Sequence, residues 1–170
     1  IAEAEVQTSP HITSNELITL LNKNAQQLPK RGESLGLMLI SIDSIANVSG
    51  TNTYSETDDI LPTIGARLKS SLRDHDSVFI TEPRQFALVL RRLNRAGSLQ
   101  VIGAKTVENM RIPLMIDGVQ HQVVVSVGLS EFPNDSNDAN SLIHHAQLAL
   151  HTAQERGEYC YESYEATMSA

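Results

Sequence analysis

The sequence predicts an α+β domain in which a central mixed, largely antiparallel sheet is flanked by helices. Segments with helical periodicity alternate with β-rich segments, and two pairs of β-rich segments are separated by the short turns typical of hairpins. Hairpins interspersed with amphipathic helices favour helices that pack on one sheet. With 170 residues, 41% of them hydrophobic, the chain is long enough to bury a core of its own.

The first half of the chain is expected to form two helices and one buried strand. Leucines recur at helical spacing over 14–27 and predict the first helix. The nearly unbroken apolar run at 35–42 is typical of a strand buried on both faces, and residues 44–48 are expected to form one short helical turn. An apolar stripe over 57–73 predicts the second helix, in which Pro62 is tolerated because it falls in the first turn.

The second half is expected to form two hairpins, two helices and a last strand. The β-rich runs 78–81 and 86–90 flank a short polar insert that contains Pro83, which presets a turn. An Asp-Gly pair separates the runs 113–116 and 119–129, and this pair is a strong hairpin signal. The remaining helices and the last strand are expected at 94–110, 141–156 and 159–164.

The composition restricts the partners and the compartment. A formal net charge of −7 argues against non-specific nucleic-acid binding, which needs a basic face. No apolar run approaches the roughly 20 residues of a membrane span, and the single cysteine, Cys160, permits no intrachain disulfide. We therefore expect a cytoplasmic domain without nucleic-acid or membrane contact, within a parent protein that can be membrane-tethered. The first residue is Ile1 and not Met, so we expect a piece of a longer protein.

Three motifs occur in the order and spacing of one family. Residues 15–23 match a helix motif written D-x-L-T-G-L-x-N-R, residues 125–129 match a strand motif v-S-i-G-i, and residues 146–154 follow a final helix A-D-x-A-L-Y-x-A-K. Together they resemble the GGDEF domain, the diguanylate cyclase fold, over residues 14–164. The resemblance implies a nucleotidyl-cyclase or polymerase-palm-like sheet and a family that forms cyclic di-GMP from GTP.

The signature that names this family is replaced. Glu82, Pro83, Arg84, Gln85 and Phe86 stand where the family has G-G-D/E-E-F, and only Phe86 is retained. In family members the glycines let the backbone approach the nucleotide, and the third residue is a carboxylate that binds Mg²⁺. Here Pro83 stiffens the turn, and Arg84 places a permanent cation at the metal position.

Other positions that the family uses for catalysis are also replaced. By the resemblance, the second metal-binding Asp corresponds to Ser41, and the lysine and arginine that hold phosphates correspond to Gln154 and Glu158. Phosphoryl transfer depends on positioning and on charge neutralisation. We therefore expect no enzymatic activity, no bound metal and no other cofactor. The alternative, an active cyclase, would need Asp43 and Glu82 to replace the lost carboxylates.

Two retained features imply nucleotide contacts. Arg73 and Asp76 fit the R-x-x-D pattern with which active members bind inhibitory cyclic di-GMP, and Asp58 corresponds to a guanine-reading Asp. An arginine can bind guanine or phosphate through its bidentate fork. From the residues alone, Arg73 and Asp76 are better explained as a helix end and a strand-entry cap, and Asp58 as a helix cap.

We expect a catalytically inactive regulatory or scaffolding module of a bacterial cyclic di-GMP signalling protein. Residues 1–13 are then a linker or helical lead-in, 14–164 the domain, and 165–170 a linker towards an EAL domain, which the resemblance implies. The alternative is a nucleotide-binding module that takes cyclic di-GMP at Arg73 and Asp76, or GTP without turnover. The expected partners are the EAL domain, another protein, or a second copy in a homodimer.

Overall fold

The computed structural model describes residues 10–28, 33–47, 57–82, 84–116 and 118–169. Within these ranges only the backbone is described at Asn47, 57–59, Glu82, Ala166 and Ser169. The elements in chain order are α1 (Ser14–Gln26), β1 (Ser34–Asn47), α2 (Thr57–Ser70), β2 (Ser77–Glu82), β3 (Gln85–Leu93), α3 (Ser98–Met110), β4 (Leu114–Ile116), β5 (Val119–Phe132), α4 (Ala139–Arg156), β6 (Cys160–Ser163) and the 3₁₀ helix η2 (Ala166–Ser169).

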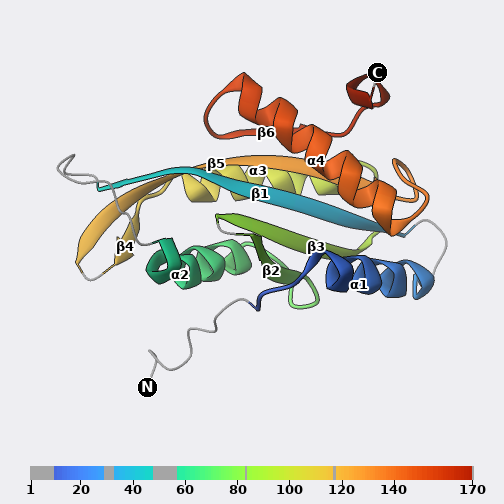
Figure 1. The fold of residues 1–170 in the computed structure, drawn as a ribbon, viewed down its shortest axis with the longest axis horizontal. Helices are drawn as coiled ribbons and strands as arrows, with labels where there is room; N and C mark the ends of the chain where they lie inside the picture. The colour runs from blue at the N-terminus through green and yellow to red at the C-terminus, as the bar shows by residue number, and fades with distance from the viewer. Residues whose placement is uncertain (1–9, 29–32, 48–56, 83, 117, 170) are drawn as a thin grey trace.

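The strands form one sheet in the order β2-β3-β1-β5-β4, and β6 also pairs with β5. Every pair is antiparallel except β5 with β6, which is parallel. The predicted mixed, largely antiparallel sheet of an α+β domain is therefore confirmed. Figure 1 shows β1 and β5 as the two long strands at the centre of the domain.

Helices cover both faces of this sheet. Alternate residues of β1 point to opposite faces, so each face has its own core cluster. Met38 and Ile40 belong to a core cluster that includes the apolar stripes of α2 and α3. Leu37 and Leu39 belong to a second cluster that includes the stripes of α1 and α4. The domain thus has three layers, with α4 lying across the central strands (Figure 1).

Three local predictions differ from the structure. The helical turn expected at 44–48 is wrong, because β1 continues to Asn47 and pairs with β5 beyond an irregularity between Ile42 and Ser44. Ladder hydrogen bonds to β5 therefore override the local preference of a short polar segment. Helix α3 begins at Ser98, later than expected, after Gly97 with a φ of 85°. Pro62 lies inside α2, beyond its first turn.

Gly128 allows α4 to pack unusually close to β5. A Cβ at this position would lie 2.3 Å from the Leu150 nitrogen and 2.4 Å from the Ala146 carbonyl oxygen. Both of these atoms belong to the α4 backbone, so neither can rotate away. The close approach brings the C-terminal half of α4 to the site described below.

The chain before α1 covers the outer strand of the sheet. His11 forms a parallel bridge with Ile80 of β2. The Ile80 N–H donates to the Pro10 carbonyl, and the Ile12 N–H donates to the Ile80 carbonyl, both at 2.9 Å. Ile12 itself is buried in the core beside α1. In the described part of the chain, no helix is both long and apolar enough to cross a membrane.

Candidate functional site

Polar side chains from three elements converge near the middle of the sheet, on its α4 face. Ser41 of β1 lies opposite Ser126 of β5 in the strand register. The Ser41 hydroxyl donates to Asp43 Oδ1 at 2.8 Å, and the Ser126 hydroxyl donates to Asp43 Oδ2 at 2.6 Å. From α4, the Gln154 amide donates to the Ser41 oxygen at 3.0 Å and to Asp43 Oδ1 at 3.4 Å. One carboxylate is therefore held by three neutral donors.

The structure brings together two of the positions predicted from the resemblance. Ser41, at a metal position, and Gln154, at a phosphate position, are 113 residues apart in sequence and directly hydrogen-bonded. Glu158 lies beyond the end of α4 and is exposed. From sequence, residue 126 is predicted only as part of the strand motif at 125–129, because its position opposite Ser41 depends on the pairing of β1 with β5.

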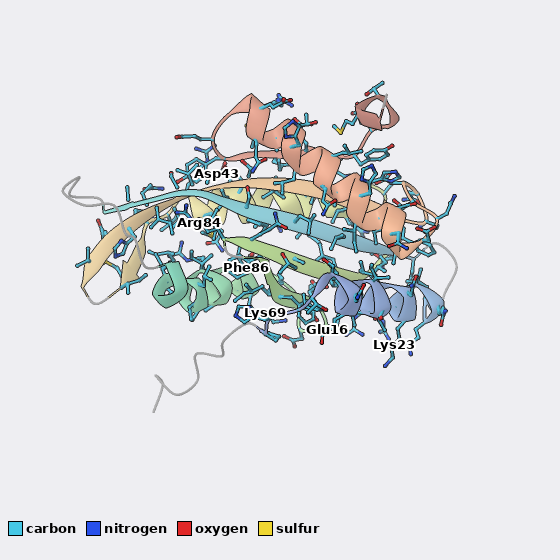
Figure 2. All side chains as sticks on the ribbon, viewed as in Figure 1. Glu16, Lys23, Asp43, Lys69, Arg84 and Phe86 are labelled. Atoms are coloured by element: carbon cyan, nitrogen blue, oxygen red, sulfur yellow. The ribbon has the colours of Figure 1, made fainter. Side chains whose placement is uncertain are left out.

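The turn between β2 and β3 reaches the same end of β1. Arg84 adopts a φ of 69°, in the left-handed region that favours glycine. Its carbonyl accepts a hydrogen bond from the Ile42 N–H at 2.7 Å, which ties the turn to β1 next to Asp43. Figure 2 shows Asp43 and Arg84 labelled at this end of the sheet. Pro83 and the Glu82 side chain lie outside the described residues.

The rest of the signature segment has structural roles. Phe86 is fully buried in the core that faces α2 and α3. Gln85 lies opposite Ser41 in the register with β1 and accepts a hydrogen bond from the Thr81 hydroxyl at 3.3 Å. The retained aromatic residue thus fixes the hairpin in the core, whichever ligand the turn binds.

The residues present do not fit the Mg²⁺ that the resemblance implies. Mg²⁺ requires several oxygen ligands in near-octahedral geometry, and carboxylates supply the charge. Among the described side chains, Asp43 is the carboxylate at this site, and both of its oxygens already accept hydrogen bonds. Arg84 adds a positive charge at the other implied metal position. No group of three potential metal ligands occurs within the described ranges of the chain.

Arg73 and Asp76 form a closed ion pair after α2. The Asp76 side chain is fully buried and accepts hydrogen bonds from Arg73 N at 3.0 Å, Arg73 Nε at 2.9 Å and Arg73 Nη2 at 3.0 Å. It also accepts one from the Arg91 N–H at 3.3 Å. This geometry is that of a structural cap, and cyclic di-GMP binding by the pair stays a prediction. The Asp58 side chain lies outside the described residues, so its predicted guanine contact also stays a prediction.

The resolved pKa shifts occur at the other end of the β1–β5 pair, where Glu131 of β5 lies opposite Gly36, roughly 23 Å from Asp43 at the rise of a strand. Burial raises the pKa of Glu131, and a hydrogen bond from the Ser34 hydroxyl opposes this shift. Burial also raises the pKa of Asp135, and its hydrogen bond from the Glu131 N–H opposes it. These groups affect stability as a function of pH rather than the chemistry of the site.

The comparisons with known proteins decide the family. The profile of the family described as diguanylate cyclase, GGDEF domain, matches residues 15–160. The chain is a GGDEF domain. Its backbone superposes on the solved GGDEF domain of TpbB (YfiN) from Pseudomonas aeruginosa with a TM-score of 0.81 at 18% identity, over 97% of this chain and 95% of that one.

Relatives of this GGDEF domain include enzymes that make cyclic di-GMP and enzymes that degrade it. It is 28% identical over 127 residues to the cyclic di-GMP phosphodiesterase NbdA of Pseudomonas aeruginosa, covering 75% of this chain and 16% of that protein. It is 26% identical over 144 residues to diguanylate cyclase A of Treponema denticola, covering 82% of this chain and 38% of that protein. The chain thus spans well under half the length of these relatives. GGDEF domains of this kind belong to cyclic di-GMP signalling proteins.

The expectation that this domain is not an enzyme, which was based on its replaced residues, is wrong. The matching family is that of the diguanylate cyclases, and a relative that matches most of the domain is a diguanylate cyclase. Replacement of the signature and of Ser41 changes the ligands at the site, but it does not establish that activity is absent. Turnover of GTP by this domain is open to direct measurement.

Proposed function

We propose that this GGDEF domain is a nucleotide-responsive regulatory module of a cyclic di-GMP signalling protein. It binds a guanine nucleotide where β1, the β2–β3 turn and α4 meet, and binding changes the activity of the rest of the protein. The observation that carries this proposal is the hydrogen-bonded network of Ser41, Asp43, Ser126 and Gln154. These groups are preformed and polar, and they connect three elements that lie far apart in the sequence.

The network connects a ligand bound at Asp43 to buried groups of the sheet and to α4. Asp43 is solvent-exposed, whereas Ser41 and Ser126 are buried beneath it, so a ligand at Asp43 acts on groups that are continuous with the sheet. Gln154 connects the same groups to the last turns of α4. Helix α4 in turn precedes β6 and the C-terminal residues. A nucleotide that accepts a hydrogen bond from Gln154 would therefore shift α4, the last α-helix of the described chain.

The regulatory part of the proposal draws on the relatives. The matched region makes up 16% of the phosphodiesterase NbdA, so most of that protein lies outside it. A solved protein from M. capsulatus, described as an EAL/GGDEF domain protein, has the same fold with a TM-score of 0.70 at 19% identity, over 84% of this chain and 92% of that one. We propose an EAL domain in the same protein as the partner that this GGDEF domain regulates.

A second candidate is binding of cyclic di-GMP at Arg73. The Arg73 side chain is 39% exposed, and its Nε and Nη2 atoms are engaged by Asp76 and the Arg91 carbonyl. A ligand would have to use the remaining nitrogen or compete with a fully buried carboxylate. This cost makes the Asp43 site the better candidate.

Calorimetric titration of GTP and of cyclic di-GMP into separate samples of the chain tests both sites. We expect saturable GTP binding that Gln154→Ala weakens and Arg73→Ala leaves unchanged. Cyclic di-GMP binding lost in Arg73→Ala would favour the second candidate instead. The GTP samples are also assayed for cyclic di-GMP, which shows directly whether bound GTP is turned over. Absence of heat with either nucleotide would refute the proposed function.

A further inference from the structure

Arg84 is a cation at the candidate nucleotide site whose side chain has no partner among the described residues. Its Nε atom is buried and has no hydrogen-bond partner, and no described residue forms an ion pair with its guanidinium. Buried polar groups in proteins are nearly always hydrogen-bonded, because leaving one unpaired costs about 1–3 kcal/mol and more for a charged group. An unpaired arginine nitrogen therefore favours an acceptor from outside the described residues.

The described carboxylate beside this turn, Asp43, does not balance the charge of Arg84. The Arg84 carbonyl is bonded to the Ile42 N–H, so the turn is fixed next to Asp43. Asp43 nevertheless accepts its hydrogen bonds from Ser41, Ser126 and Gln154 and forms no ion pair with Arg84. In the described part of the site, the Asp43 carboxylate is hydrogen-bonded by neutral donors, and the Arg84 guanidinium has no counter-ion.

We propose that Arg84 binds the phosphate oxygens of the nucleotide and replaces the divalent metal as the neutralising charge, so that GTP binding is independent of Mg²⁺. This inference rests on the proposed function and assigns the phosphate contact within it. A guanidinium presents two parallel N–H donors that match phosphate oxygens, and such charge-assisted bonds are stronger than neutral ones. Arg84 stands where the family has a metal-binding carboxylate, and this one replacement both removes a ligand for Mg²⁺ and supplies the positive charge.

The backbone at Arg84 suits this role. The left-handed conformation, with φ at 69°, is held by the hydrogen bond from Ile42 to the Arg84 carbonyl. Pre-organisation of this kind reduces the entropy that a flexible cation would lose on binding. Glycine adopts the same conformation without strain, so Arg84→Gly removes the guanidinium and keeps the turn.

The chain offers a matched control for this substitution. Arg84 directly precedes β3, and Arg92 is a second arginine with a positive φ, 58°, which is exposed near the far end of that strand. At the rise of a strand the two residues are roughly 26 Å apart. Arg92→Gly therefore changes the same side chain, net charge and backbone preference at a distant place.

The test is calorimetric titration of GTP into the chain, once with EDTA and once with MgCl₂. We expect dissociation constants that agree within about twofold between the two conditions. Arg84→Gly should weaken binding at least about tenfold, the smallest effect expected for a hydrogen bond to a charged group. Arg92→Gly should match the unaltered chain, and Arg84→Lys should fall between, because it keeps the charge and loses the fork.

Two results would overturn the inference and leave the proposed function intact. These are GTP binding that requires Mg²⁺, and GTP binding that Arg84→Gly leaves unchanged. Absence of GTP binding in both conditions would instead remove the proposed function itself. The double variant Ser41→Asp, Arg84→Glu restores carboxylates at both implied metal positions, and its GTP binding should become Mg²⁺-dependent.

Discussion

Substitution of Gly128 by alanine should displace α4 from the sheet. The added Cβ would lie 2.3 Å from the Leu150 nitrogen and 2.4 Å from the Ala146 oxygen. Ordinary contact distances are about 3.5 Å or more, so the helix must move away by roughly 1 Å. A gap of this size forfeits about a quarter to a half of each dispersion contact beneath the helix. Overpacking usually costs about 1–3 kcal/mol, and a rigid backbone obstacle places Gly128→Ala at or above that upper value.

For a domain of this size each kcal/mol corresponds to roughly 2–4 °C, so Gly128→Ala should lower the Tm by about 6–12 °C. The measurement is thermal and urea unfolding followed by far-UV and near-UV circular dichroism, whose coincidence tests the two-state assumption. The matched control is Gly103→Ala in α3, whose Cβ would meet the Leu129 Cδ1 atom at 3.0 Å, a side-chain contact that a shift of a few tenths of an ångström relieves. Alanine is favoured over glycine by about 1 kcal/mol inside a helix, so the control should be neutral or slightly stabilising. A loss of less than about 1 kcal/mol in Gly128→Ala would refute the close-approach reasoning.

Two further predictions concern buried carboxylates. Asp76→Asn should cost about 1.5–3 kcal/mol in urea unfolding, because the buried side chain loses its charge-assisted hydrogen bonds from Arg73. A cost below about 1 kcal/mol would contradict this. Glu131→Gln tests the pH dependence: the pKa of Glu131 is raised above 4.5 by burial, so its contribution is present at low pH and is lost as pH rises through the raised pKa. The variant should thus gain stability relative to the unaltered chain between pH 4 and pH 7, and a pH-independent difference would exclude this explanation.

The sequence predicted the elements well wherever apolar periodicity is regular. Helix α1 and β2 lie within a residue of their expected positions, whereas β3 continues to Leu93, three residues beyond the expected end. The prediction for the end of β1 failed because residues 44–47 mix polar and apolar side chains. Only their pairing with 121–124 of β5 makes them a strand. Such pairing is a tertiary effect that no local pattern contains.

The site could be predicted as a set of positions but not as a network. The resemblance singled out Ser41 and Gln154, yet their hydrogen bond across 113 residues depends on how closely α4 approaches β5. Arg73 and Asp76 are only three residues apart, so their capping role was accessible to local reasoning. The inference of no activity went too far, because lost ligands at one metal site do not define everything a fold can catalyse.

The hydrogen bonds of Ile80 to Pro10 and Ile12 have a practical consequence for expression of the domain. A chain shortened to begin at Ser14 would keep every helix and strand. Its outermost strand, however, would present two open backbone groups and the apolar surface on which Ile12 now lies. Exposed strand edges recruit other chains and lead to aggregation. An expressed form of the domain should therefore include Pro10 to Ile12, ahead of the first helix.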